Sequence, residues 1–367
     1  MPRKRTAPLT DLPDRYFVKE LAGENPPSLP AMKRLYELAS SLYGLCPWRV
    51  LDESQLILVR DSVSGELCYC SVMGMLGEVY SVHAYIGTES LRLFRRMQAE
   101  EITDAGEFFA TQHSVSVEFV PKAELERPDR ELLAALGHPQ GRGLASPIFR
   151  TIRPGFHPWF VTEEEARTLA ECIRAVIVVS AAVSSQKSAK FWDLAGTYPM
   201  VSRMEGAEPR YQVDLVKAVL PAEPPTMPVR LEEETLRPLR SQDYTVRGVM
   251  ELDHMLTGTP IGKKGERSAC AAIALAVDAE SGMVLAPDLN DSSVAAGDAL
   301  ARVFLNAVQA SHTLPKEVRV RSQSLKDCLT PLMESFGVAV RVTGRLPAAD
   351  EARSSLLGYL QGGSPGR

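Results

Sequence analysis

The stretch from Ala271 to Leu360 constrains the fold more than any other part of the chain. It opens with an apolar run, Ala271–Val277, in which apolar and polar residues do not alternate, and such a run is typical of a strand buried on both faces of a sheet. Asp278–Gly282 then predicts a tight turn, and Met283–Leu289 predicts a strand that returns beside the first. The elements expected after it are helices over 294–310, 325–336 and 349–360 and strands over 318–320 and 338–342. This order predicts a mixed α/β sheet covered by helices.

The length of 367 residues predicts two domains, because single hydrophobic cores usually stop growing below that size. The boundary is expected at 221–243, where a cluster of prolines is followed by consecutive glutamates, since such a stretch pairs poorly in a sheet. The expected parts are a flexible arm over 1–28, a first domain over 29–220, a linker over 221–243, a second domain over 244–360 and a disordered tail over 361–367.

The first domain has the pattern of an antiparallel sheet with helices. Short links join the strands expected over 56–60, 67–75 and 78–86, and such links leave no room for a crossover. Thr162 and Glu165 form a capping-box pattern that predicts the start of a long amphipathic helix. The other expected elements are helices over 29–43, 89–100 and 121–136 and strands over 114–120, 149–152, 200–203 and 211–216. We therefore expect an α+β domain.

Composition argues against several classes of partner. The formal net charge of -5 predicts no broad attraction to nucleic acid or to an anionic membrane. The basic segment Met1–Thr10 lacks the apolar stretch of a signal peptide, and the helix after Thr162 carries too many charges to span a bilayer. These features predict a cytoplasmic protein with no membrane partner.

The cysteines and histidines are not spaced along the sequence as the ligands of a metal site usually are. The 6 cysteines are dispersed, which is typical of reduced thiols. We expect Cys68 and Cys70 to point to opposite faces of a strand and not to form a zinc pair, and we interpret His83 as a half-buried core residue. No dinucleotide fingerprint or nucleophile elbow occurs, so the sequence predicts no cofactor and no metal.

The order of elements in the second domain resembles the RNase H-like core of integrases and transposases. That superfamily places one Asp on the first strand, a second at the end of the fourth strand and an acid on a later helix, and these hold two metal ions. Asp278 and Glu351 match the first and third acids, so they are the candidate catalytic residues. Arg321 follows the strand 318–320 where the second acid would stand, and its charge would repel a metal ion. We also expect two strands before the first helix, where the superfamily has three.

Both candidate acids have a structural interpretation as well. Asp278 suits a turn, and Glu351 complements the positive end of a helix. If the chain were a metal nuclease, Asp253 or Asp350 would supply the missing acid.

Several residues are candidates for partner binding. Arg319 and Arg321 are expected on one face of a strand, where a nucleic-acid or anionic partner could bind, although edge charges that prevent aggregation explain them equally well. Trp159 is a candidate contact for a protein partner. The complete set of candidate binding residues is Lys263, Lys264, Arg319, Arg321, Arg341 and Trp159.

Two stretches, Tyr69–Leu91 and Ala276–Leu357, carry a further resemblance. They resemble a family of uncharacterised bacterial proteins in which an α+β domain of unknown function precedes an α/β domain of unknown function. The resemblance implies no activity. Our first hypothesis is a non-catalytic binding or scaffold protein with a degenerate RNase H-like domain, and it favours a protein partner over nucleic acid. The alternatives are a divalent-metal nuclease and a small-ligand regulatory protein with a pocket between the domains.

Overall fold

The computed structural model describes residues 24–62, 64–102, 105–137, 145–185, 191–192, 196–204, 210–217, 227–263 and 266–362. The chain divides into two compact units between 221 and 222, with 262–268 assigned to the first unit and 105–107 to the second. Most of the predicted arm and tail, 1–23 and 363–367, lies outside the described residues.

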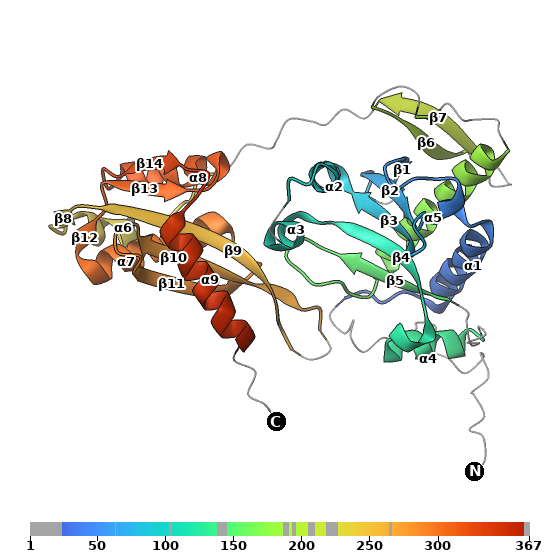
Figure 1. Ribbon diagram of the computed structural model, residues 1–367, viewed down its shortest axis with the longest axis horizontal. Coiled ribbons are helices and arrows are strands. Elements are labelled where there is room, and N and C mark those ends of the chain that lie inside the picture. The colour runs from blue at the N-terminus through green and yellow to red at the C-terminus, as the bar shows by residue number, and fades with distance from the viewer. Residues whose placement is uncertain are drawn as a thin grey trace, which may run out of the picture. The chain divides into compact units, whose positions relative to one another are not determined.

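The first unit is built on a sheet with the order β5-β4-β3-β2-β1-β6-β7 (Figure 1). Its strands are β1 (Ile57–Arg60), β2 (Leu67–Met73), β3 (Tyr80–Ile86), β4 (Ser114–Val120), β5 (Ser146–Ile152), β6 (Thr197–Met204) and β7 (Arg210–Lys217). All neighbours from β5 to β1 are antiparallel, so the predicted meander is confirmed. β1 and β6 are parallel, because the chain crosses the sheet through a helix between β5 and β6.

Helices α1 (Leu29–Leu45) and α5 (Glu163–Ser184) pack their apolar stripes against one face of this sheet. The predicted capping box at the start of α5 is present: Thr162 N donates to Glu165 Oε2 over 2.8 Å, and Glu165 N donates to Thr162 Oγ1 over 3.4 Å. Helix α2 (Gly87–Gln98) covers part of the other face, where it shares an apolar cluster with β2 and β3.

The helix predicted over 121–136 is divided. A 3-10 turn, Lys122–Glu124, is followed by extended backbone at Leu125 and Glu126, and α4 (Arg127–Ala135) begins after them. Pro128 lies in the first turn of α4, where its missing N–H costs no hydrogen bond, and it disfavours helical backbone before it. The remaining helical elements of this region are α3 (Ala105–Thr111) and the 3-10 turn Pro47–Arg49.

The second unit is built on a sheet with the order β11-β10-β9-β13-β14. Its strands are β9 (Val249–Ile261), β10 (Ala269–Asp278), β11 (Val284–Asp291), β13 (Glu317–Val320) and β14 (Ala339–Val342), and a separate parallel pair joins β8 (Thr245–Val246) to β12 (Thr313–Leu314). β9, β10 and β11 are antiparallel, whereas β13 runs parallel to both β9 and β14. Our expectation of two strands before the first helix is wrong, because β9 continues through Gly258 and makes a third.

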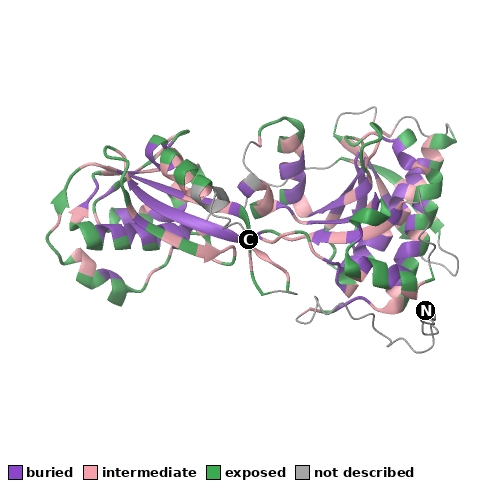
Figure 2. Cartoon of the chain, turned by 60° about the horizontal axis from the view of Figure 1, so that its bottom comes forward, coloured by how far each residue is buried: buried purple, intermediate pink, exposed green. Residues whose placement is uncertain are grey.

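Helices cover both faces of this sheet (Figure 1). α7 (Ala296–Ser311) and α8 (Gln323–Glu334) share one apolar cluster with the sheet, and α9 (Pro347–Gly362) shares a second cluster on the opposite face. Successive side chains of β10 point alternately into the two clusters. The prediction that this strand is buried on both faces is therefore confirmed (Figure 2). Helix α6 (Glu233–Arg240) forms inside the predicted linker, because Leu236 packs into the α7 and α8 cluster.

Gly297 provides a test of packing between α7 and α8. A Cβ atom there would collide with Cys328 Sγ and would lie 3.1 Å from Val229 Cγ2. Ala is favoured over Gly in helices by up to about 1 kcal/mol, but overpacking costs about 1–3 kcal/mol. We therefore expect Gly297→Ala to lower the free energy of unfolding in urea by about 1–2 kcal/mol.

The matched control removes the colliding sulfur. Because Cys328→Ala makes room for the new methyl group, we expect the double variant to be more stable than the sum of the single effects predicts. Strictly additive effects would show that the two side chains do not meet.

Candidate functional site

A buried cluster of charged side chains joins β9, the end of β13 and α9 in the second unit. Arg321 Nε donates to Asp253 Oδ1 over 2.6 Å, and Arg321 Nη2 donates to Asp253 Oδ2 over 2.8 Å, so the pair is bidentate. The same Nη2 donates to Asp350 Oδ1 over 2.6 Å. The side chains of Asp253, Arg321 and Asp350 are 3%, 29% and 45% exposed, so the cluster is buried at one end and open at the other.

Strand register brings these residues together. β13 runs parallel to β9 with Glu317 opposite Val249 and Arg319 opposite Glu251, so two residues further Arg321 comes beside Asp253. The period of two along a strand places Asp253 and Arg321 on the face that α9 covers. The hydrogen bonds to Asp253 raise the pKa of Arg321 above its usual value, so the guanidinium stays cationic.

Glu251 is a second buried acid of β9 on the same face. It is 1% exposed, and its Oε2 accepts a hydrogen bond of 2.9 Å from the backbone N of Ala349 in the first turn of α9. A carboxylate at a helix N-terminus satisfies a free N–H and favours the positive end of the helix dipole. Two acids of β9 therefore hold α9, Glu251 directly and Asp253 through Arg321.

The structure does not bring Asp278 and Glu351 together. On β10, Leu275 and Val277 pack in the α9 cluster, so Asp278 at the next position faces the opposite side of the sheet. Its Oδ1 accepts hydrogen bonds of 2.7 Å from both the N and the Oγ of Ser281, and these bonds lower the pKa of Asp278. Glu351 is exposed on α9. Asp278 thus has the geometry of a turn residue.

Metal ligands do not gather in the described part of the chain, where no group of three or more His, Cys, Asp or Glu side chains is placed to hold an ion. In the cluster of Asp253 and Asp350, the Arg321 guanidinium lies between the two carboxylates. The arrangement can bind α9 to the sheet, but its acids are already occupied by a cation.

Two of the candidate basic residues, Arg319 and Arg341, lie on neighbouring strands. Arg319 is opposite Arg341 in the β13–β14 pair, and Arg319 Nε donates to Glu317 Oε1 over 2.8 Å. Arg341 is exposed. Lys263 belongs to the segment assigned to the first unit, and Lys264 lies outside the described residues.

Trp159 lies at a packing corner of the first unit. Its backbone N and O both pair with Thr151 over 2.8 Å, and its half-buried ring packs edge-on against Phe160 at 5.5 Å between centroids. Only part of this ring is open to a partner.

Our expectation that Cys68 and Cys70 point to opposite faces is wrong. Residues two apart in a regular strand share a face, and both thiols lie in the same core cluster as Cys172 of α5. The hydrogen bond with Cys172 raises the pKa of Cys68 far above its ordinary value, and burial of the thiol raises it further. A protonated thiol is a poor metal ligand, so the cluster behaves as part of the core.

His83 lies on β3 between Ser71 of β2 and Ser116 of β4. Burial lowers the pKa of His83 to about 4, so the ring is neutral at pH 7. Sequence reasoning placed this residue correctly as half-buried.

Sequence reasoning underestimated β9. It named Asp253 only as an alternative acid and did not consider Glu251. The signal was present in Met250–Met255, where acids alternate with apolar residues as they do in a strand with one polar face. The glycine and proline that follow the run obscured the strand.

Both halves of the chain match known families. Residues 33–198 match the family model described as Domain of unknown function (DUF7309), and residues 235–357 match the one described as Domain of unknown function (DUF6930). The chain is thus a two-domain protein that combines these two domains. No curated protein matches it. Among the described residues, no helix has the length and apolar character needed to cross a bilayer.

Arg321→Ala tests the buried cluster. It leaves Asp253 buried without its partner, and breaking a buried pair costs about 3–5 kcal/mol. Because Arg321 is partly exposed, we expect a loss of about 2–3 kcal/mol in the free energy of unfolding in urea. Asp350→Asn removes only the exposed contact and should cost about 0–1 kcal/mol. Equal losses in the two variants would contradict a cluster centred on Asp253.

His83 gives a prediction about pH. The pKa of His83 is lowered from 6.5 to about 4, so the unfolded chain binds the proton more tightly. The contribution of His83 to stability is therefore complete above about pH 6.5 and is lost as the pH falls toward about 4. We expect the free energy of unfolding of His83→Gln to depend less steeply on pH in this window than that of the wild type. Parallel pH profiles would contradict a buried neutral imidazole.

Proposed function

We propose that this protein is a non-catalytic binding protein whose second unit is a degenerate RNase H-like domain. The observation that carries the proposal is the Arg321 guanidinium, which lies between Asp253 and Asp350. Three antiparallel strands followed by two parallel strands support the RNase H-like resemblance. In this arrangement Asp253 stands on the first strand, Arg321 follows the fourth strand of the sheet and Asp350 lies on the last helix.

A guanidinium at this place changes what the acids can do. Two-metal catalysis needs carboxylates that hold cations against the attacking and leaving oxygens. Arg321 instead pairs with both Asp253 and Asp350, and it cannot lose its proton under physiological conditions. The same three side chains then connect α9 to the sheet. This favours a scaffold over a nuclease that would use Asp278 and Glu351.

The binding role is supported by the strand face beside α9. Arg319 and Arg341 are adjacent there, and β14 is the last strand of its sheet. A partner with exposed carboxylates would pair with Arg341. We favour a protein over nucleic acid because the whole chain has a net charge of -5 and because Arg319 and Arg321 are already paired with acids.

Arg321→Asp tests whether the guanidinium replaces a metal. In calorimetric titrations we expect the wild type to bind neither Mg²⁺ nor Mn²⁺ at millimolar concentration. Arg321→Asp should gain Mn²⁺ binding, because it would place a third carboxylate beside Asp253 and Asp350. Asp253→Asn in that background should abolish the gain. If the metal-free variant is unstable, a rise in its unfolding temperature on addition of Mn²⁺ would report metal binding instead.

Arg319→Asp is the matched control, because it reverses a charge two residues earlier, on the same face of the sheet. It should gain no metal binding. Metal-dependent cleavage of DNA or RNA by the wild type, lost in Asp253→Asn, would overturn the proposal.

A further inference from the structure

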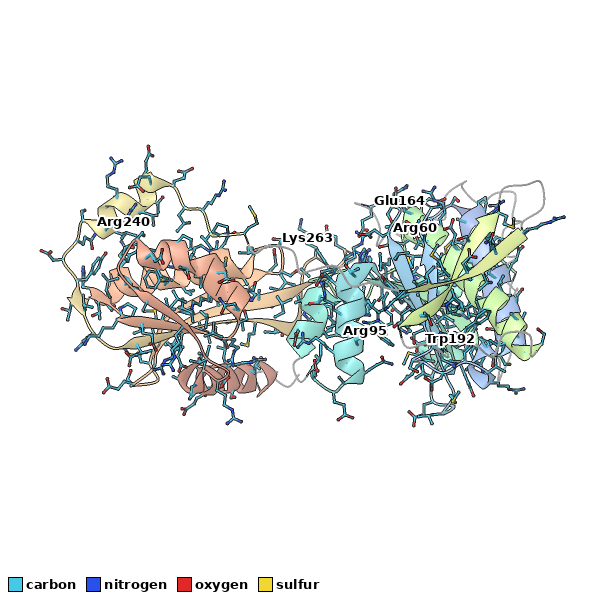
Figure 3. The ribbon with its side chains drawn as sticks, turned by 90° about the horizontal axis from the view of Figure 1, so that it is seen from above. Arg60, Arg95, Glu164, Trp192, Arg240 and Lys263 are labelled. Atoms are coloured by element: carbon cyan, nitrogen blue, oxygen red, sulfur yellow. The ribbon has the colours of Figure 1, made fainter. Side chains whose placement is uncertain are left out.

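A cavity of about 510 Å³ lies at one edge of the sheet in the first unit, where α5 meets β1, β6 and β7. Three arginines from three different elements line it: Arg60 at the end of β1, which Figure 3 labels, Arg174 of α5 and Arg203 of β6. Tyr211, which lies opposite Arg203 in the β6–β7 pair, adds a hydroxyl group to the same lining. The site is therefore rich in hydrogen-bond donors.

Arg174 is the central side chain of this cavity. It is half-buried, and within the described residues the side chains of Arg174 and Arg203 make no hydrogen bond or ion pair. Burial is the main cause that lowers the pKa of Arg174; the charges of Arg34 and Arg203 lower it further, whereas Tyr211 and Glu171 raise it in part. A partly buried cation among other cations is costly unless an anion accompanies it.

The two acids of the lining are already engaged elsewhere. Ser62 donates to Glu171 through its Oγ over 2.6 Å and its N over 3.3 Å. Asp61 accepts hydrogen bonds from Thr168 Oγ1 over 2.9 Å and from Ser64 N over 2.8 Å. These carboxylates fix the turn after β1 against α5, and neither forms an ion pair with Arg174.

The geometry points to a binding site for a phosphate-type oxyanion, held by Arg174 and Arg203 with the hydroxyl of Tyr211 as a further donor. Guanidinium groups pair with phosphate oxygens through parallel N–H bonds, and hydroxyl groups complete such sites. The cavity is larger than inorganic phosphate, so it fits the phosphate group of a small phosphorylated molecule. This site lies within the first unit and does not depend on the function proposed for the second.

The test is calorimetric titration of the full chain with inorganic phosphate and with an alkyl phosphate monoester, at constant ionic strength. We expect the wild type to bind both probes. Arg174→Gln and Arg203→Gln should each weaken binding by about ten-fold or more, because each removes a charge-assisted pair. Arg174→Lys should retain part of the affinity.

Arg167→Gln is the matched control, because Arg167 is exposed on the same helix and does not line the cavity. It should leave binding unchanged. Without phosphate, Arg174→Gln should be at least as stable as the wild type, since it relieves repulsion among the arginines. Absence of binding to the wild type, or an equal loss in Arg167→Gln, would overturn the inference.

Discussion

The second unit depends on the pairing of Arg321 with Asp253. A buried carboxylate is costly unless hydrogen bonds or a cation compensate its desolvation, and the bidentate guanidinium supplies both to Asp253. Because Arg321 also reaches Asp350, this pair fixes α9 over the central strands. Glu251 reinforces the same attachment at the first turn of the helix. The charged cluster is thus a structural link between sheet and helix.

The central sheet keeps Asp253 and Asp278 of this unit apart. Side chains alternate along β9 and β10, so Asp253 faces α9 while Asp278 faces the α7 side. Acids on opposite faces of a sheet cannot share a metal ion. The constellation that the sequence suggested for catalysis is therefore divided by the backbone, and a different set of residues occupies the α9 face.

The first unit follows a different principle. A long capped helix crosses a mainly antiparallel sheet, and three cysteines pack into the interface between them. Where this helix meets β1, β6 and the edge strand β7, polar residues line a cavity. Its acids are used to hold a turn, and two of its arginines are left without partners among the described residues. The fold thus provides an anion site without a recognisable sequence motif.

Local pattern alone determined most elements. The Thr162 capping box, the apolar run of β10 and the turn at Asp278 each depend on neighbours in sequence, so the sequence predicts them. The sequence predicts a strand only over 245–252 in this region, because the glycine and proline near the end of β9 outweigh its alternation. Only tertiary structure decided which charges meet. The pairing of Arg321 with Asp253 depends on the parallel register of strands separated by about sixty residues, and no local rule specifies that register.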